Sequence, residues 1–294
     1  GGLLQRDIIG HGHQIALRDG DIGRIGPLAG RHGDDLPGRA EVLAARPAWA
    51  ARDRDGGLLT KNGFEWMNAY HPEVQQFILD LVLEVARTYD VAGVQGDDRL
   101  PAQPSEGGYS EATRALYRQD HGGSDPPRGW LDPGWLRWRA DRLTAFGRRL
   151  YEEVKAVDPG LQVSFSPSVY PWGYRNYLQD WPRWVEASVA DQILPQVYRY
   201  DIDAYRQTLD AQRAAALQAS AGADTLVYPG VLMNAGDYVV PWDLLEQALA
   251  YNRQQGHRGE VFFFYEGLRK NDGALADSLL ATFYAEPARP PFEF

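Results

Sequence analysis

Short apolar runs alternate with amphipathic stretches along most of this 294-residue chain. The predicted strands cover 91–98, 161–166, 190–199, 224–232 and 260–266. The predicted helices cover 72–88, 135–157, 203–219, 242–255 and 274–284. Strands that are separated by helical crossovers pack as a parallel sheet with helices on its faces. The alternation therefore predicts an α/β fold built on parallel strands.

Polar or aromatic residues follow each predicted strand, and this repetition favours one architecture. In a (β/α)8 TIM barrel the carboxyl ends of all strands meet at one rim, which carries the chemistry. A doubly wound sheet would usually have a glycine-rich phosphate-binding turn after an early strand, and the sequence has no such turn. We therefore expect residues 46–294 to form a barrel-type catalytic domain.

The first 45 residues differ from the rest of the chain. They contain 10 of the 31 glycines but none of the 9 Trp, 16 Tyr and 10 Phe. The pattern there suggests a helix over 3–9 and a helical turn over 41–45, with little periodicity between them. We expect residues 1–45 to be an irregular, degenerate segment. Six strands at most would then be present, and these cannot close an eight-stranded barrel.

The predicted helix over 72–88 has clear local signals. Pro72 suits the first helical position, and Glu73 suits the positive amino end of the helix. His71 is predicted to cap this helix rather than to act in catalysis. The apolar residues that follow at spacings of three and four, and that predict a core-facing stripe, are Val74, Phe77, Ile78, Leu81, Val82 and Val85.

Composition limits the partners. The chain has 30 Lys and Arg against 40 Asp and Glu, a net charge of −10, and no basic run, so a nucleic-acid partner is not expected. No apolar run reaches the roughly 18 residues of a membrane span. The absence of cysteine excludes disulfides and thiolate metal sites. His11 and His13 could ligate zinc on a strand, but flanking glycines favour a turn, and we expect neither metal nor cofactor.

The stretch VAGVQGDDRLP joins an apolar strand to two adjacent carboxylates, Asp97 and Asp98. Because barrel chemistry lies just past the carboxyl ends of strands, this pair is a candidate site. The alternative is that one aspartate caps the next helix while the other is solvated. The connection that follows, 99–130, is long and rich in Gly, Pro, Ser and Asp. Loops of that length are usually functional or disordered.

From about Trp66 to Leu268 the chain resembles a known family on several motifs in order. They are MNAYHPEVQQFILDLVLEVARTYDVAGVQGDDR, WLRWRADRLTAF, LYEEVKAVDP, VSFSPSVYPWGYRNYLQDWPRWV, ILPQVYRYD and GEVFFFYEGL. The family is the glycosyl hydrolase-like family 10 of bacterial proteins, and the chain looks most like a cyanobacterial-type group within it. The resemblance implies a (β/α)8 barrel that acts on surface polysaccharides, with distant kinship to hydrolases of poly-N-acetylglucosamine. It also suggests an exported or cell-envelope location, although no signal peptide is visible here.

The N-terminal part departs from the family pattern. The family's first two strands have no counterpart, and its third should fall near 14–25, where QIALRDGDIGRI lacks aromatic residues. Upstream, LLQRDIIGHGH resembles the helix before that strand, and the likeness returns near Leu43. We offer the hypothesis that the block between is a frameshifted stretch. Translating codons 14–43 in the other two frames tests it, and the hypothesis fails if neither frame gives an aromatic strand.

Glycoside hydrolysis requires a protonated acid and a second carboxylate that acts as nucleophile or base. The carboxylates at predicted strand ends are Asp97, Asp98, Asp237 and Glu266. Adjacent strand residues point to opposite sides, so we favour Asp98 as the acid or its partner. Asp97 would then orient its neighbours or bind Arg99 or Arg199. Glu266 follows the apolar run 261–264, and apolar surroundings favour the protonated form of a carboxyl.

Other side chains near the predicted strand ends are expected to bind the sugar. The polar candidates are Asn68, Arg99, Ser166, Gln196, Tyr198 and Arg199, and the candidates for stacking are Tyr170, Trp172 and Tyr265. The predicted function is a glycoside hydrolase acting on an amino-sugar-containing bacterial polysaccharide, with the stereochemical outcome open. The alternatives are a carbohydrate-binding barrel without activity and a truncated, inactive family member.

Overall fold

A computed structural model describes residues 5–7, 13–17 and 38–287. The strands are β1 (Gln5–Asp7), β2 (His13–Leu17), β3 (Thr60–Lys61), β4 (Phe64–Glu65), β5 (Val91–Gly96), β6 (Gln162–Phe165), β7 (Gln192–Ile193), β8 (Gly230–Leu232), β9 (Asn234–Ala235), β10 (Tyr238–Val239) and β11 (Val261–Phe263). The α-helices are α1 (Gly38–Ala45), α2 (Pro72–Thr88), α3 (Glu111–Asp120), α4 (Pro133–Val157), α5 (Trp172–Tyr177), α6 (Trp181–Glu186), α7 (Ile202–Ala219), α8 (Trp242–Gln254), α9 (Glu266–Arg269) and α10 (Ala274–Ala281). The short 3-10 helices are η1 (Pro47–Trp49), η2 (Ala223–Leu226) and η3 (Asn271–Gly273).

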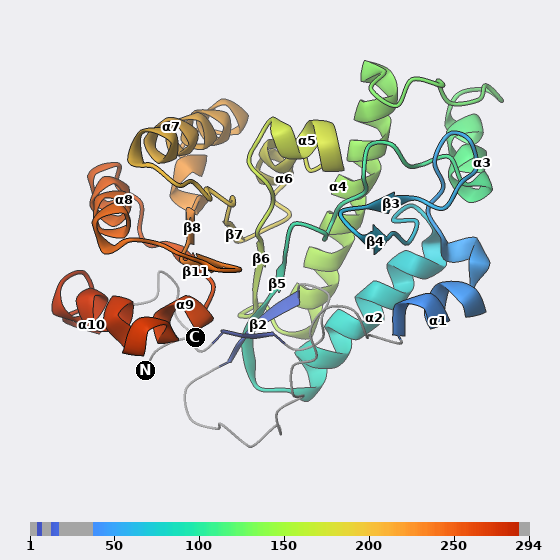
Figure 1. The fold of residues 1–294 in the computed structure, drawn as a ribbon. Coiled ribbons are helices and arrows are strands. Elements are labelled where there is room, and N and C mark those ends of the chain that lie inside the picture. Colours follow the sequence, from blue (N-terminus) through green and yellow to red (C-terminus); the bar gives the residue numbers. More distant parts are fainter. Residues whose placement is uncertain (1–4, 8–12, 18–37, 288–294) are drawn as a thin grey trace.

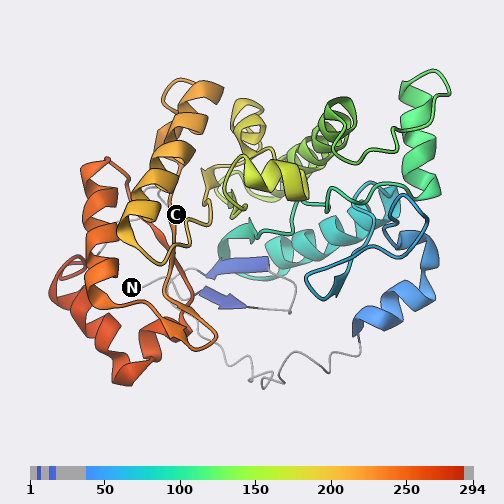
Figure 2. The ribbon, with the colours of Figure 1, turned by 45° about the horizontal axis from the view of Figure 1, so that its top comes forward.

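Five parallel strands form the centre of the described structure. β6 pairs with β5 on one side and with β7 on the other, and β11 pairs with β8. The parallel bridges Ile193–Val227 and Gln196–Gly230 join β7 to β8. Helices α7, α8 and α10 gather on one side of the strands, and α2 lies on the opposite side (Figures 1 and 2). The predicted alternation of parallel strands and helices is confirmed.

The described residues do not close a barrel. In the pairing order the last strands are β11 at one edge and β1 at the other, and no ladder joins them. The sequence predicted an incomplete barrel for this reason: too few strands are present to close one. The described fold is therefore an open arrangement of strands with helices around it.

The N-terminal strands correct two expectations. β1 stands where a helix over 3–9 was predicted, so that prediction is wrong. β2 lies beside β5 where the family's third strand was expected, but it runs antiparallel, from the His13–Gly96 pair to the Leu17–Val91 pair. An unpaired strand edge can hydrogen-bond a neighbour of either direction. The remaining residues of the segment 1–37 lie outside the described residues.

Two central strands are shorter than predicted. β7 and β8 have two and three residues, whereas the sequence predicted strands over 190–199 and 224–232. Pro195 and Pro229 lie inside those stretches, and proline has no N–H to donate to a ladder. η2 also takes up the start of the second stretch. The two stretches still run parallel to each other, but isolated bridges join them instead of a continuous ladder.

Helix α2 has the predicted bounds, and its start uses the predicted signals. Pro72 occupies the first turn, and the His71 ring Nδ1 accepts a hydrogen bond from the Glu73 N–H at 3.2 Å. The cap role of His71 is thereby confirmed. None of the described helices is both long and apolar enough to cross a bilayer.

The apolar stripe of α2 faces a cavity as well as the core. Val74 and Val82 are buried, as predicted. A cavity of about 410 Å³ lies against the stripe, lined by apolar side chains of α2, α4, β5, β6 and the β3–β4 hairpin. The residues of the predicted stripe that line it include Phe77, Ile78, Leu81 and Val85.

Much of the aromatic content packs the interior. Trp135, Trp181 and Trp184 are fully buried, and the Phe165 ring packs edge-on against Trp184 at 5.5 Å. Burial of large rings supplies much of a core's free energy. The abundance of aromatic residues is therefore only in part a property of the candidate site.

Candidate active site

The carboxylate pair lies in the turn directly after β5. Asp97 Oδ1 accepts a hydrogen bond from the Arg99 N–H at 2.9 Å. Asp98 Oδ1 lies 4.0 Å from Arg99 Nε, and the two side chains are 38% and 32% exposed. The Arg99 guanidinium in turn lies 4.0 Å from the centre of the Phe64 ring. Arg99 therefore contacts Asp97 through its backbone and Asp98 through its side chain.

Burial makes this pair easier to protonate than ordinary aspartates. It raises the pKa of Asp97 to about 7, with a further increase from the neighbouring Asp98 charge and a decrease from the Arg99 N–H. Burial also raises the pKa of Asp98, and the Arg99 charge opposes that rise. A carboxyl that keeps its proton near neutral pH can act as a general acid.

Both carboxyls lie close to the Tyr198 phenol. Their negative charges and, above all, its burial raise the pKa of Tyr198. The expectation that Asp97 and Asp98 face opposite sides rests on strand alternation, which ends with β5 at Gly96. The Tyr198 ring stacks on Phe263 of β11, with centroids 5.2 Å apart. Tyr198 thus connects the end of β5 with the end of β11.

Protein atoms engage the polar groups of Ser166 and Gln196. Ser166 is buried, and its Oγ donates to the Leu194 carbonyl at 2.9 Å. Gln196 is half-buried and donates from Nε2 to the Ser166 carbonyl at 3.1 Å. Both residues brace the ends of β6 and β7, and any contact with a sugar stays a prediction.

Arg199 lies before α7 and points toward that helix. Its Nε donates to Thr208 Oγ1 at 3.0 Å, and its Nη1 donates to the Tyr198 carbonyl at 2.7 Å. The alternative that Asp97 binds Arg199 is therefore not supported, because Arg99 provides the contact.

Asn68 is fully buried and has structural partners. Its Nδ2 donates to Ser110 Oγ at 2.7 Å, and its Oδ1 accepts from Thr113 Oγ1 at 3.1 Å and from the Tyr70 N–H at 3.1 Å. These bonds tie the start of α3 to the loop before α2. Any contact of Asn68 with a sugar stays a prediction.

The three predicted stacking rings differ in exposure. Tyr170 is half-buried and packs against Trp181, with ring centroids 6.3 Å apart. Trp172 at the start of α5 is 50% exposed, and Tyr265 is 47% exposed. The two exposed rings can offer a face to a ligand, whereas Tyr170 mainly supports the core.

Glu266 and Asp237 occupy positions that differ from the expected strand ends. Glu266 is half-buried in the first turn of α9, three residues after β11 ends. The apolar run before it is less enclosed than predicted, with Phe263 38% exposed, because β11 has one neighbouring strand among the described residues. Asp237 is exposed in the turn between β9 and β10. The catalytic role of Glu266 stays a prediction.

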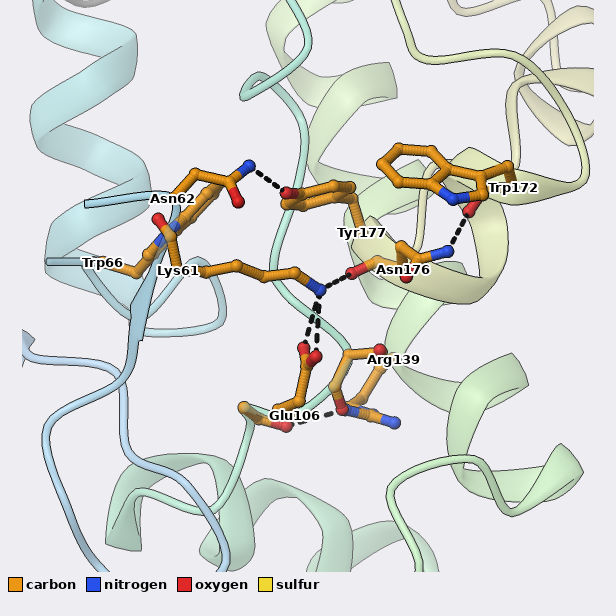
Figure 3. Close-up of polar contacts among 10 residues, drawn as sticks. Lys61, Asn62, Trp66, Glu106, Arg139, Trp172, Asn176 and Tyr177 are labelled. Atoms are coloured by element: carbon orange, nitrogen blue, oxygen red, sulfur yellow. Dashed lines mark hydrogen bonds and ion pairs between the residues drawn. The ribbon is translucent and has the colours of Figure 1, made fainter. Parts of the chain in front are cut away.

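Sequence reasoning missed a polar cluster that the β3–β4 hairpin makes with the 104–107 loop and α5. Lys61 Nζ donates to both carboxylate oxygens of Glu106 at 3.0 Å and to the Asn176 carbonyl at 3.3 Å. Asn62 Nδ2 donates to the Tyr177 hydroxyl at 2.7 Å (Figure 3). The available signals were the Asn-Gly turn at 62–63, which favours a hairpin, and the length of the 99–130 connection.

Aromatic rings surround the same cluster. Tyr177 is 6% exposed, and its ring lies 5.5 Å from Trp172 and 5.8 Å from Trp66. Lys61 Nζ lies 4.6 Å from the centre of the Tyr177 ring. Figure 3 shows these side chains converging from the hairpin, the 104–107 loop and α5.

No grouping of three or more histidine and carboxylate side chains suited to a metal occurs in the described part of the chain. His11 lies outside the described residues, and so does the His13 side chain. The described site offers carboxyl, amide, hydroxyl and aromatic groups, which suit acid–base chemistry on a carbohydrate.

An α/β fold with paired carboxyls directly after a parallel strand is compatible with the class of glycosidases. The sequence profile of the family Glycosyl hydrolase-like 10 matches residues 32–237. The chain therefore belongs to the glycosyl hydrolase-like family 10. The cyanobacterial-type subgroup stays a prediction.

Two curated relatives are named glycosyl hydrolases. DigH of Escherichia coli K12 is 29% identical over 154 residues, which cover 45% of this chain and 33% of DigH. YngK of Bacillus subtilis 168 is 25% identical over 254 residues, which cover 76% of this chain and 47% of YngK. The chain thus spans between a third and a half of these relatives.

Solved structures share the fold. The PgaB (BpsB) glycoside hydrolase domain from Bordetella bronchiseptica matches with a TM-score of 0.60 at 15% identity, covering 79% of this chain and 70% of that domain. The β-galactosidase from Marinomonas ef1 matches with a TM-score of 0.56 at 12% identity, covering 76% and 42%. At these identities the likeness extends to the fold alone.

Proposed function

We propose that this protein hydrolyses glycosidic bonds in a bacterial surface polysaccharide that contains amino sugars. The observation that carries the proposal is the carboxyl pair after β5, in which burial raises the pKa of Asp97 to about 7. A pair that retains a proton near neutral pH can protonate a glycosidic oxygen. Membership of a glycosyl hydrolase-like family supports the reaction class.

Asp98 is the proposed proton donor of the pair. Its side chain is 38% exposed, so a substrate can reach it. Asp97 has one carboxylate oxygen engaged by the Arg99 N–H, and the Asp98 charge adds to burial in raising the pKa of Asp97. Arg99 orients Asp98 and Tyr198 lies alongside both carboxyls, while Glu266 is a candidate for the second carboxylate.

The proposed sugar contacts come from exposed rings and strand-end amides. Trp172 and Tyr265 offer ring faces for stacking on a pyranose, and Gln196 is a candidate for hydroxyl or acetamido groups. The amino-sugar class is supported by the family resemblance of the sequence. The negative net charge of the chain argues against a nucleic-acid ligand.

Two wider proposals accompany this one. The five parallel strands with their outer helices are proposed to be part of a (β/α)8 barrel, as the solved glycosidases with the shared fold suggest.

The site of action is proposed to be the cell envelope, as the family resemblance suggests. Fractionating cells that express the native gene tests the location, and recovery in the cytosolic fraction would contradict it.

Replacing Asp98 with asparagine tests the reaction. Hydrolysis of amino-sugar oligosaccharides should fall at least about 100-fold, the usual contribution of a general acid, while oligosaccharide binding persists. Asp141→Asn is the control, because Asp141 is an exposed, ion-paired carboxylate on α4. Reducing-end release and calorimetric binding measure the two effects.

Two outcomes would contradict the proposal. A parent protein that binds oligosaccharides but hydrolyses none of them would indicate a carbohydrate-binding protein. An Asp98→Asn variant as active as the parent would show that Asp98 is not the proton donor.

A further inference from the structure

Glu106 is a carboxylate held in place by the half-buried Lys61 and the buried Arg139. Lys61 Nζ donates to both of its oxygens at 3.0 Å. The carbonyls on either side of it, of Ser105 and Gly107, both accept hydrogen bonds from Nη1 of Arg139, which is fully buried. The Glu106 side chain itself is 40% exposed. It is therefore fixed at its backbone and its head group, yet open to a substrate or water.

The β3–β4 hairpin brings Glu106 to the same region as Asp98. Lys61 and Phe64 are paired residues on the two strands of the hairpin, and directly opposite side chains start about 5 Å apart. Lys61 binds Glu106, while Phe64 packs under the Arg99 guanidinium that contacts Asp98. One cross-strand pair thus supports both carboxyls.

Tyr177 lies near both carboxylates. The negative charges of Asp98 and Glu106 add to the effect of burial in raising the pKa of Tyr177. Its hydroxyl accepts a hydrogen bond from Asn62, at the tip of the same hairpin. The residue after Glu266, Gly267, packs against Met233 of the β8–β9 segment.

We propose that Glu106 is the second carboxylate of the hydrolytic site and acts as the general base that activates water. This inference rests on the proposed function, because it assigns the partner that an acid at Asp98 requires. Lys61 occupies one lone pair on each oxygen of the carboxylate. Since an ionised carboxylate has about four acceptor sites, sites remain for a water molecule.

The step balances without a cofactor. The protonated Asp98 carboxyl gives its proton to the glycosidic oxygen as the bond from that oxygen to the anomeric carbon breaks. A water oxygen forms the new bond to the anomeric carbon and loses a proton to Glu106. Asp98 ends ionised and Glu106 protonated, and exchange with solvent restores both.

Three glutamate variants test the assignment. Glu106→Gln keeps the shape of the side chain but removes the base, so hydrolysis should fall by about 10² to 10⁴-fold. Glu111→Gln is the matched control, since Glu111 is also ion-paired to a cation but 76% exposed at the start of α3. Glu266→Gln tests the competing candidate for the second carboxylate, and a loss of activity as large as that of Glu106→Gln would contradict the assignment. Circular dichroism confirms that each variant is folded.

Azide separates the base from a merely structural role. Azide attacks the anomeric carbon as an anion and needs no base, so it should restore turnover to Glu106→Ala and yield a glycosyl azide. It should not restore Asp98→Asn on the polysaccharide, because the leaving oxygen still needs a proton.

The outcomes test the assignment of Glu106 separately from the proposed hydrolase function on which it rests. Loss of activity in Glu106→Gln with azide rescue of Glu106→Ala supports the assignment. A Glu106→Gln variant as active as Glu111→Gln, or azide rescue of Glu266→Ala instead, overturns it and leaves the hydrolase function standing. A parent protein that is inactive on every amino-sugar polymer would contradict both the Glu106 assignment and the proposed hydrolase function.

Discussion

Asp97 and Asp98 are consecutive residues, yet the fold gives the two carboxyls different partners. The Arg99 N–H contacts Asp97 and the Arg99 guanidinium contacts Asp98. Burial raises the pKa of both, to about 7 for Asp97. The local environment of this one turn therefore raises the pKa of both carboxyls, which favours the protonated form that general acid catalysis needs.

The raised pKa of Asp97 predicts how stability depends on pH. Between about pH 4 and pH 7 the folded carboxyl keeps its proton, while the unfolded chain, with a pKa of 3.8, loses it. The folded state then binds more protons, so the free energy of unfolding falls as pH rises through this window. Asp97→Asn should remove about 1 to 3 kcal/mol of that fall, allowing for partial solvent screening.

Urea unfolding of the parent and of Asp97→Asn at pH 5 and pH 8 measures this difference. An equal pH dependence in both proteins would mean that Asp97 is already ionised at pH 5 in the folded protein.

At the scale of elements, the contact between β5 and β6 depends on a glycine. A Cβ added at Gly93 would lie 2.2 Å from the Gln162 carbonyl oxygen and 2.8 Å from its Cβ. The nearer atom belongs to the backbone of the adjacent strand and cannot rotate away. The strand that presents the carboxyl pair is thus held in register by close backbone packing.

Gly93→Ala should therefore destabilise the protein by about 3 kcal/mol or more, as overpacking against backbone does. Gly129→Ala is the control, because a Cβ there meets no atom within 4 Å. Chemical unfolding compares the two variants. A Gly93→Ala variant as stable as Gly129→Ala would show that β5 and β6 are farther apart than described.

At the scale of the whole molecule, packing is uneven. The core around β5 and β6 buries Trp181 and Trp184 completely, whereas the face of α2 borders an apolar cavity of about 410 Å³. Cavities lower stability because their lining lacks contact partners. The missing contacts lie between α2 and the strands β5 and β6.

Two substitutions at Val85, which lines this cavity, should change stability in opposite directions. Val85→Leu partly fills the space and should stabilise by about 0.5 to 1 kcal/mol. Val85→Ala enlarges the cavity and should destabilise by about 1 to 2 kcal/mol. Helix propensity alone would make both variants more stable, so thermal unfolding that shows two stabilised variants would contradict the packing argument.

Local signals determined much of the fold from sequence. The bounds of α2 follow from His71, Pro72 and its apolar stripe, and the cap bond forms within two residues. The run Val91–Gly96 and the carboxyl pair after it were predicted for the same reason, since a strand and the turn that ends it are coded by neighbouring residues. Family motifs added the reaction class.

The tertiary structure decided which distant side chains meet. Asn68 is taken into a buried network, Tyr198 reaches Phe263, and Lys61 binds Glu106 across 45 residues of sequence. These contacts depend on how the loops close over the strands, and loop closure has no periodicity that a sequence pattern can reveal. The sequence alone thus determined most of the helices, the order of the parallel strands and the first carboxyl pair. Tertiary packing decided which other groups lie beside that pair.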